Sequence, residues 1–548
     1  EEGVVPQRTV LSRSLDVQAA TEYGSLRHNA LLWRSWLQEY PETYTALTNA
    51  QERWSVRLAA AQDEDADALS AVLRDAVADL EKYYARAFEA FRKGIQNPKP
   101  LMKTNPAKED YVRVAPGGKY FVHSDGSFFT PLGYNHNPDW PQTYESAIGR
   151  PEYDPAVTDA FFKHLSECGV NLIRLMLESP AGGFLLEDPV GTFNVEQVAF
   201  LDNIVNLARK HDIKLMITPW DTFWMGHTWD RNPYNSKNGG PVGTRVEFIT
   251  RPEVIEAQKR RLKFIIDRWG NTGTIFAWEI LNEADKWWDA SGEQTQAWAK
   301  EMGDYVREYE KQKWGRNHLI CISTGHPIPD GAWGELAYRQ PGMDLATTHL
   351  YLDAAMWPDE PIGPAIAVRK GVTYALGQIE DSRPYIDGEN GPINRWIADG
   401  KLDDEVFHHM SWAHLASGGA GSSLRWPYRG PHHLSEGMYQ HLGRMSKFVK
   451  DVPWAKLIGT PSEIRVPVPE GWVACSTGTS QGALVWVASS KPSEMKLSIT
   501  WNGPKTVKYR CYDTKSGEWI CNGTARPADG DLPILIGGER SSVAVVLE

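Results

Sequence analysis

Between about residues 110 and 450, short runs of β-branched and aromatic residues alternate with longer stretches of helical periodicity. This alternation predicts parallel strands joined by crossover helices, since a parallel neighbour can be reached only through a long connection. Eight units of this kind predict a (β/α)8 TIM barrel, an α/β fold whose functional site lies at the carboxyl ends of the strands. The predicted strands are 128–133, 171–175, 214–219, 275–279, 319–323, 345–349, 384–387 and 422–426.

The regions on either side of the barrel have different patterns. Residues 17 to about 97 carry helical periodicity and contain no glycine between Gly24 and Gly94. They predict an N-terminal helical segment whose apolar face docks on the barrel or forms a dimer interface. After Pro453, short alternating strands predict a C-terminal antiparallel β-sandwich, with strands at 464–468, 484–488, 496–500, 507–512 and 543–547. The predicted domains are therefore 1–105, 106–452 and 453–548.

The composition excludes several kinds of partner. The net charge is -12, from 58 basic and 70 acidic residues, and no basic run offers a surface for nucleic acid or an anionic membrane. No apolar run approaches the ~18 residues of a membrane span. The chain also holds 23 Trp and 21 Tyr, whose flat faces with a polar edge suit sugar rings. A neutral carbohydrate partner is therefore expected; the oligomeric state stays open.

The start of the chain and its cysteines bear on the compartment. The sequence begins Glu1-Glu2-Gly3, without Met and without an apolar signal region, which is expected of a processed or trimmed chain that is secreted or periplasmic. Of five cysteines, Cys511 and Cys521 flank a predicted turn, and the sequence leaves open whether they form a disulfide. No Cys or His spacing indicates zinc. We expect no metal and no cofactor.

Two apolar runs end in a glutamate. Phe276-Ala-Trp-Glu-Ile-Leu-Asn-Glu places Glu283 just after the fourth predicted strand, and Arg383-Pro-Tyr-Ile-Asp-Gly-Glu places Glu389 just after the seventh. A barrel strand that ends in this way delivers a carboxyl group to the rim. Two carboxyl groups at one rim are what hydrolysis of a glycosidic bond requires.

Further motifs accompany these glutamates in the expected order. They are Asn282 before Glu283, Gly-Val-Asn-Leu-Ile-Arg174 on strand two, His349-Leu-Tyr351 after strand six, and Trp426 on strand eight. Together, over roughly residues 110 to 450, they resemble the clan A glycoside hydrolases, nearest to family 5. In that family the residue after the acid is usually Pro, whereas here it is Ala284. Asn390-Gly391, which follows the second glutamate, also departs from the usual family pattern. These departures concern subfamily and substrate.

The resemblance implies a role for each matched residue. Glu283 would be the general acid and Glu389 the nucleophile of a retaining mechanism with a covalent glycosyl-enzyme. Arg174 would hold the nucleophile, unless it pairs only with Glu279 inside the barrel. Asn282 would bond the sugar 2-hydroxyl. His349 and Tyr351 would surround the nucleophile and the reacting sugar, and Trp426 would form the platform beneath that sugar.

Residues after strands one, three and four are the predicted sugar subsites: Asn135, His136, Trp220, Asp221, Trp224, Trp287 and Trp288. The prediction is a retaining β-glycoside hydrolase that cleaves an oligo- or polysaccharide by double displacement. The sugar, the linkage and endo or exo action stay open. One alternative is a non-catalytic carbohydrate-binding barrel, against which the intact motifs speak. The other is a metal-dependent barrel hydrolase, for which His136, His326 and His349 are too scattered.

Overall fold

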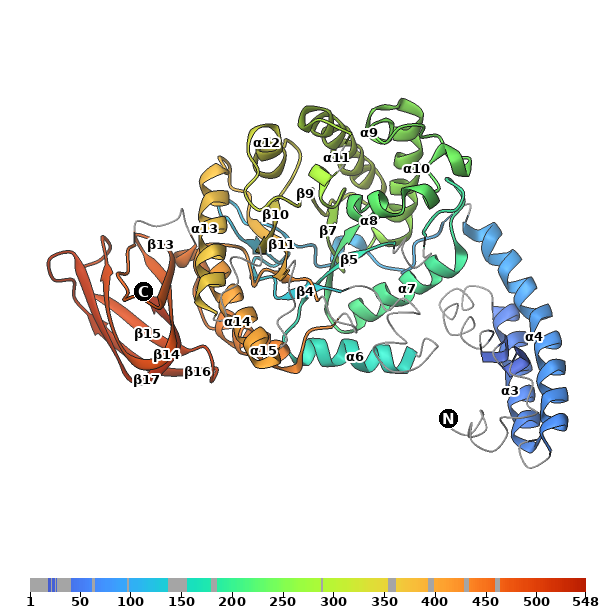
Figure 1. Cartoon of the computed structure of the whole chain (residues 1–548), viewed down its shortest axis with the longest axis horizontal. Helices are drawn as coiled ribbons and strands as arrows, with labels where there is room; N and C mark the ends of the chain where they lie inside the picture. The colour runs from blue at the N-terminus through green and yellow to red at the C-terminus, as the bar shows by residue number, and fades with distance from the viewer. Residues whose placement is uncertain are drawn as a thin grey trace.

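A helical hairpin and an antiparallel sheet lie at opposite ends of a central barrel (Figure 1). The computed structural model describes residues 18–20, 22–24, 26, 41–61, 65–95, 98–136, 155–178, 185–286, 289–352, 361–392, 399–427, 433–458 and 464–548. The predicted domain boundaries near residues 105 and 452 separate the helical hairpin, the barrel and the antiparallel sheet. This division into domains stays a prediction.

The central sheet is a closed parallel barrel. Its strand order is β8-β7-β6-β5-β4-β12-β11-β10-β9. β8 and β9 are the two halves of the predicted fifth strand, interrupted only at Ile322, so the two ends of this order meet. The predicted (β/α)8 barrel is confirmed. The strands are β4 (Gly133–Asn135), β5 (Leu172–Met176), β6 (Lys214–Thr218), β7 (Ile275–Glu279), β8 (Leu319–Cys321), β9 (Ser323–Thr324), β10 (Ala346–Leu352), β11 (Tyr385–Pro392) and β12 (Leu424–Arg425).

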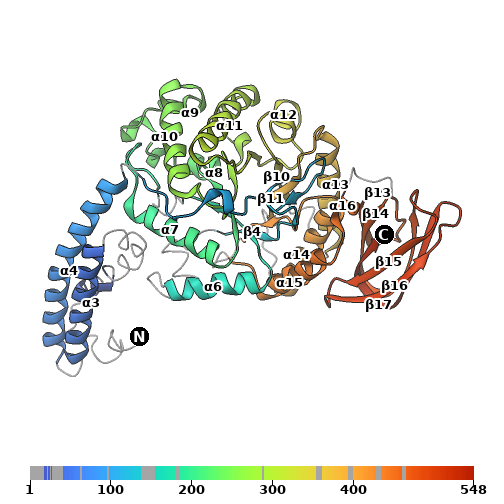
Figure 2. The same cartoon turned by 180° about the vertical axis from the view of Figure 1, so that it is seen from behind.

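Helices follow the strands and surround the sheet (Figure 2). α10 illustrates why they form: Pro252 occupies its first turn, and Val254, Leu262 and Trp269 are buried along one face. Short helices α8 (Thr222–His227) and α9 (Glu247–Thr250) lie between β6 and α10. The main helices are α6 (Pro155–Glu167), α7 (Val195–Lys210), α10 (Pro252–Trp269), α11 (Gly292–Trp314), α12 (Gly331–Arg339), α13 (Ile362–Gln378), α14 (Gly400–Ala416) and α15 (Glu436–Lys450).

A small antiparallel sheet closes the amino-terminal end of the barrel. It contains β1 (Arg113–Val114), β2 (Phe121–Val122) and β3 (Phe128–Phe129), with the expected turn at Asp125-Gly126. Phe121 and Phe129 pack on Phe276 with ring centroids 5.0 and 5.6 Å apart. The prediction of one strand over 128–133 was wrong. Pro131 has no backbone N–H to donate, and the run divides there between β3 and the barrel strand β4.

The N-terminal helices α3 (Pro41–Ala61) and α4 (Ala66–Ile95) form a hairpin. They bury their apolar faces mainly against each other, through residues such as Leu47, Leu58 and Leu80. The expected docking on the barrel includes contact between α4 and α7, and the hairpin extends away from the barrel (Figures 1 and 2). The chain that follows is tied to α10, because the Leu101 N–H donates to the Arg268 carbonyl at 2.8 Å.

The C-terminal part is a five-stranded antiparallel sheet, as the sequence predicted, with the order β13-β14-β17-β15-β16. Its two longest strands change register between Ala488 and Met495, and both halves contribute to one buried apolar cluster, so the sheet packs against itself. Cys511 and Cys521 form a disulfide across β15 and β16. Residues 464–468, predicted as a strand, lie outside any strand. The strands are β13 (Trp472–Thr479), β14 (Gly482–Thr500), β15 (Val507–Asp513), β16 (Glu518–Ala525) and β17 (Asp531–Leu547).

A buried histidine network joins this sheet to the barrel helices α14 and α15. Arg444 Nη1 lies 3.2 Å from His441 Nδ1, and because a guanidinium only donates, that nitrogen is an acceptor. His408 Nδ1, 3.1 Å away, therefore carries the proton. His408 Nε2 then acts as an acceptor; it lies 3.0 and 3.2 Å from the hydroxyl oxygens of Thr514 and Ser542 on the sheet, and the Thr514 hydroxyl in turn contacts Ser542 Oγ at 2.6 Å. The network requires both imidazoles to be neutral.

Acid should therefore destabilise the folded chain. Burial, reinforced by nearby cations, lowers the pKa of His441 to about 3, and burial lowers the pKa of His409 to about 4. An unfolded histidine titrates near 6.5, so the unfolded chain takes up protons first. The free energy of unfolding should fall as the pH drops below about 6.5, and should keep falling toward about 4. Urea unfolding midpoints measured across this range test the expectation.

The variant His441→Gln should show a smaller fall of the midpoint with pH than the wild type, because it removes one of these uptake sites. His227→Gln, which changes an exposed histidine of α8, is the matched control and should behave like the wild type. Equal pH dependence in the wild type and His441→Gln would contradict the role given to the network.

Candidate active site

Arg174 lies at the centre of the candidate site. β5 carries it into the barrel, where its side chain is 0% exposed. Nε and Nη2 donate to the Glu279 carboxylate at 2.6 and 2.9 Å, and Nη1 donates to Glu389 at 2.5 Å. The same guanidinium donates to Asn135 Oδ1 at 2.8 Å and to Asn282 Oδ1 at 2.5 Å. Burial acts to lower the Arg174 pKa, but the two carboxylates outweigh it and raise that pKa.

Glu279 anchors the inner side of this guanidinium. Its carboxylate is fully buried and also accepts from the Thr218 hydroxyl at 2.7 Å. Burial acts to raise the pKa of Glu279, but Arg174 more than offsets it, and the pKa is lowered. The sequence leaves two possibilities for Arg174: contact with Glu389, or pairing with Glu279 alone. A guanidinium has five N–H donors, and here it makes both contacts.

Glu389 stands at a bulge between β10 and β11. Thr348 pairs with Asp387 and His349 pairs with Glu389, so Gly388 is the extra residue. A Cβ on Gly388 would lie 2.5 Å from Thr347 Oγ1, which leaves room only for glycine. Beyond the bulge, Glu389 Oε1 accepts from Arg174 and Oε2 accepts from the Tyr351 hydroxyl, each at 2.5 Å. Both donors favour the ionised form of a carboxyl group.

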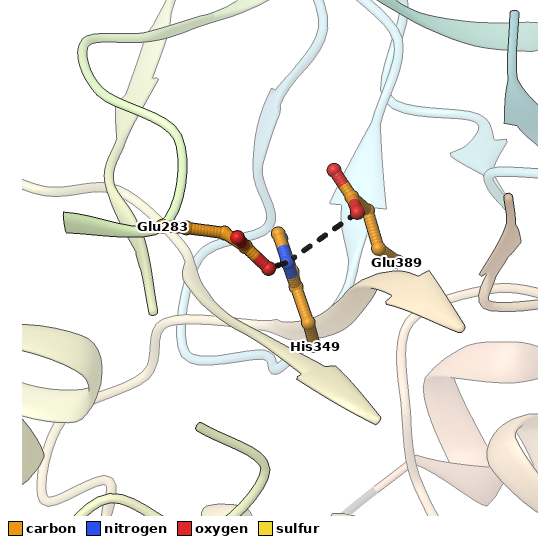
Figure 3. A group of neighbouring side chains, drawn as sticks. All are labelled: Glu283, His349 and Glu389. Atoms are coloured by element: carbon orange, nitrogen blue, oxygen red, sulfur yellow. Dashed lines mark hydrogen bonds and ion pairs between the residues drawn. The ribbon is translucent and has the colours of Figure 1, made fainter. Parts of the chain in front are cut away.

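Glu283 faces Glu389 across His349 (Figure 3). His349 Nδ1 lies 2.9 Å from Glu283 Oε1 and 3.6 Å from Glu389 Oε2. One side-chain ligand atom from each of the three residues lies within 4.8 Å of the other two. Burial acts to lower the pKa of His349, but the two glutamates raise it above its usual value. The imidazole therefore links the two carboxyl groups, which come from β11 and from the segment after β7.

Asn282 and Asp221 form the side of the site next to β6. The Asn282 N–H donates to the Trp220 carbonyl at 2.9 Å, and Asn282 Nδ2 donates to Asp221 Oδ1 at 2.7 Å. Since Arg174 occupies Oδ1 of Asn282, the orientation of that amide is set from both ends. Burial raises the pKa of Asp221 to about 7, with a smaller contribution from the negative charges of Glu283 and Glu389.

The structure departs from the sugar-binding roles predicted after strand one. Asn135 is 1% exposed, and its Nδ2 donates to the carbonyls of Gly388 and Leu424 at 2.9 and 3.0 Å. It ties β4 to its neighbours and orients Arg174, instead of facing a ligand. His136 is also 1% exposed and packs against aromatic rings, with its centroid 5.7 Å from that of Phe161. β4 is only three residues long, and both side chains lie in the interior.

Trp220 also differs from its predicted role. Its side chain is 2% exposed, with the Arg261 guanidinium 5.1 Å from the ring centroid. The ring fills the core behind the site and cannot form a sugar platform. The backbone N–H of Trp426 donates to the Asn390 carbonyl at 2.9 Å, and the side chain is half-buried. Trp224 lies on α8, but its side chain, like Trp287 and Trp288, falls outside the described residues.

Asp387 is a buried acid that the sequence analysis did not select. Its Oδ1 accepts the Leu350 N–H at 2.9 Å, and its Oδ2 accepts from Asn390 Nδ2 at 3.0 Å. It thereby joins β10 to β11 next to the bulge. Burial raises its pKa to about 8. The sequence does carry a signal for Asp387, because it is an acidic residue within the apolar run before Glu389.

The group formed by Glu283, His349 and Glu389 has a spacing that could also hold a metal ion, and it is the one such group found within the described ranges. The Arg174 guanidinium, 2.5 Å from Glu389, already places a positive charge against it. His136 packs against Phe161, and His326 is exposed. The expectation that the chain needs no metal stays a prediction.

Comparison with known proteins finds similarity to one enzyme family. Residues 133–356 match the family model for cellulase, glycosyl hydrolase family 5. Mannan endo-1,4-beta-mannosidase 3 of Oryza sativa subsp. japonica is 28% identical over 228 residues, which are 37% of this chain and 47% of that protein. Mannan endo-1,4-beta-mannosidase 7 of Arabidopsis thaliana is 26% identical over 260 residues, which are 42% of this chain and 58% of that protein. The chain thus spans about half the length of these relatives.

Solved structures agree on the fold. A glycoside hydrolase superimposes with a TM-score of 0.57 at 14% identity, over 81% of this chain and 98% of the other. A family 5 glycoside hydrolase from Bacteroides vulgatus superimposes with a TM-score of 0.56 at 13% identity, over 81% and 95% of the two chains. The chain is thus similar to the clan A glycoside hydrolases, near family 5. Among the helices described, none is long and apolar enough to cross a lipid bilayer.

The two glutamates bound to Arg174 should differ in their effect on stability. In Glu279→Gln, the new amide N–H₂ must face a buried donor of Arg174 or Thr218, since both carboxylate oxygens accept from these residues. In Glu389→Gln, the amide can face the Tyr351 hydroxyl oxygen instead. We expect Glu279→Gln to lower the free energy of unfolding by about 3 kcal/mol, and Glu389→Gln to change it by less than about 1 kcal/mol.

Urea unfolding of both variants measures this difference. If Glu389→Gln lost as much stability as Glu279→Gln, the inner carboxylate would not be the anchor of the guanidinium.

Proposed function

We propose that the chain is a retaining β-glycoside hydrolase, with Glu283 as general acid and Glu389 as nucleophile. The observation that carries the proposal is the convergence of the two carboxyl groups, with an oxygen of each within 4.8 Å of the other. An inverting enzyme needs its carboxyl groups ~6.5 to 9.5 Å apart to admit a water molecule, whereas retaining enzymes place them ~5 to 5.5 Å apart. The close spacing supports double displacement.

The contacts suggest how the residues act. Arg174 and the Tyr351 hydroxyl both donate to Glu389, which would hold this carboxyl group in place for attack on the anomeric carbon. Glu283 would protonate the leaving oxygen as the glycosidic bond breaks, and would then take a proton from the water that releases the sugar. His349 lies between the two carboxyl groups and can stabilise whichever of them is ionised.

We propose a β-1,4-linked mannan or a related β-mannoside as the substrate class. The support comes from the relatives of rice and Arabidopsis, whose names describe endo-acting mannan β-mannosidases. Asn282 would bond the sugar 2-hydroxyl and Trp426 would lie beneath the sugar ring. We also propose export from the cytoplasm, which the Cys511–Cys521 disulfide supports, because disulfides persist in oxidising compartments.

The first test is turnover on β-mannan and on a panel of β-glucans and aryl glycosides. Glu283→Gln and Glu389→Gln should each lower kcat on an unactivated substrate by about a thousandfold or more, because general acid catalysis and covalent catalysis are both lost. Circular dichroism should show an unchanged fold. A chelator should leave the wild-type rate unchanged. Rates near the wild type in either variant would overturn the assignment of the two glutamates. If the wild type turned over none of these substrates, the non-catalytic carbohydrate-binding barrel would be the better account.

The second test assigns the two roles. Glu389→Ala should regain activity on an aryl glycoside when azide is added, because the anion fits in the vacated nucleophile position. The glycosyl azide formed should have the inverted anomeric configuration, which proton NMR measures. With Glu283→Ala, added azide should instead give the retained configuration. The opposite pairing of variant and configuration would exchange the roles of the two glutamates.

A further inference from the structure

Glu283 has a backbone conformation that its residue type rarely adopts. Its φ is 47°, in the left-handed region that favours glycine. Such a conformation persists only where the surroundings hold it. Neighbouring groups do so here: the Ser323 hydroxyl accepts the Glu283 N–H at 3.0 Å, and the Lys286 N–H donates to the Glu283 carbonyl at 2.8 Å.

Thr222 adds a side-chain contact to that strained residue. It is the first residue of α8 and is 1% exposed. Its hydroxyl donates to the Glu283 carbonyl at 2.6 Å and lies 3.1 Å from the Asn282 carbonyl. The first residue of α8 thereby holds the backbone of Glu283, although Thr222 does not touch the carboxyl group of Glu283.

Gly325 leaves the space that the Glu283 carboxyl group occupies. A Cβ on Gly325 would lie 2.8 Å from Glu283 Oε1 and 2.7 Å from Lys286 Cε. The end of the Lys286 side chain could move aside at little cost, since that side chain is 39% exposed. The Glu283 carboxyl group is held by His349 at 2.9 Å and could not move without losing that contact.

We propose that Thr222 and Gly325 are positioning residues for the acid: one fixes the backbone of Glu283, and the other keeps its carboxyl group in place. The proposal rests on the proposed function of Glu283. Protonation of the leaving oxygen demands accurate placement of the acid, whereas attack by Glu389 does not involve these contacts. Substitution of either residue should therefore lower kcat/KM only for substrates whose leaving group needs a proton.

The test is a series of aryl glycosides of the sugar that the wild type cleaves, from dinitrophenyl to unsubstituted phenyl. kcat/KM reports formation of the glycosyl-enzyme. For Thr222→Val and Gly325→Ala, we expect a loss of about ten- to hundredfold on the phenyl glycoside and less than about threefold on the dinitrophenyl glycoside. Thr222→Ser keeps the hydroxyl and should stay close to the wild type.

Two control variants separate this effect from general damage. Thr477→Val changes a buried threonine of β13, and Gly377→Ala adds a Cβ where nothing lies within 4 Å; both should match the wild type on every substrate. The two test variants act through different contacts, so either one is informative if the other folds poorly. An equal loss on all leaving groups, or no loss, would overturn the positioning role.

Glu283→Gln measured on the same series separates the two proposals. If it loses activity mainly on poor leaving groups while Thr222→Val and Gly325→Ala do not, only the positioning role is wrong. If Glu283→Gln shows no dependence on the leaving group, the proposed function of Glu283 is wrong as well.

Discussion

The site depends on a single buried cation. Arg174 enters from β5 and reaches Glu279 at the end of β7, Asn282 beyond it, and Glu389 on β11. A guanidinium without exposure to water must be compensated by carboxylates, and its planar fork sets where they can lie. The inner carboxylate satisfies most of this requirement. The outer one, Glu389, is held in position at the rim by the same guanidinium.

Around this cation, the backbone directs the reactive groups in two unusual ways. Glu389 follows a bulge at Gly388, and Glu283 adopts a left-handed conformation. Regular strand geometry would alternate side chains between the two faces of the sheet. The departures bring both carboxyl groups and His349 to one point (Figure 3). Strain of this kind is typical of functional sites, where surrounding contacts hold a conformation that is otherwise costly.

The parts outside the barrel have a different relation to the site. The C-terminal sheet packs on α13 and α14, behind the barrel wall, and its contact with α14 and α15 includes neutral histidines. The helical hairpin touches the barrel through α4 and α7. Among the residues that the structure describes, neither part contributes a side chain to the cluster around Arg174. This arrangement favours a structural role for both and leaves the chemistry to the barrel.

The sequence by itself determined the architecture and pointed to the two glutamates at the rim. Alternating strand and helix patterns predicted the barrel, and apolar runs that end in Glu283 and Glu389 predicted rim carboxyl groups, because hydrophobic periodicity and strand ends are local properties. Tertiary structure alone decided which neighbours face the ligand. Asn135 and Trp220 looked like subsite residues but are buried, and Thr222 and Gly325 gave no signal. Whether a side chain turns inward depends on register, bulges and packing between strands far apart in the chain, and local sequence does not encode these.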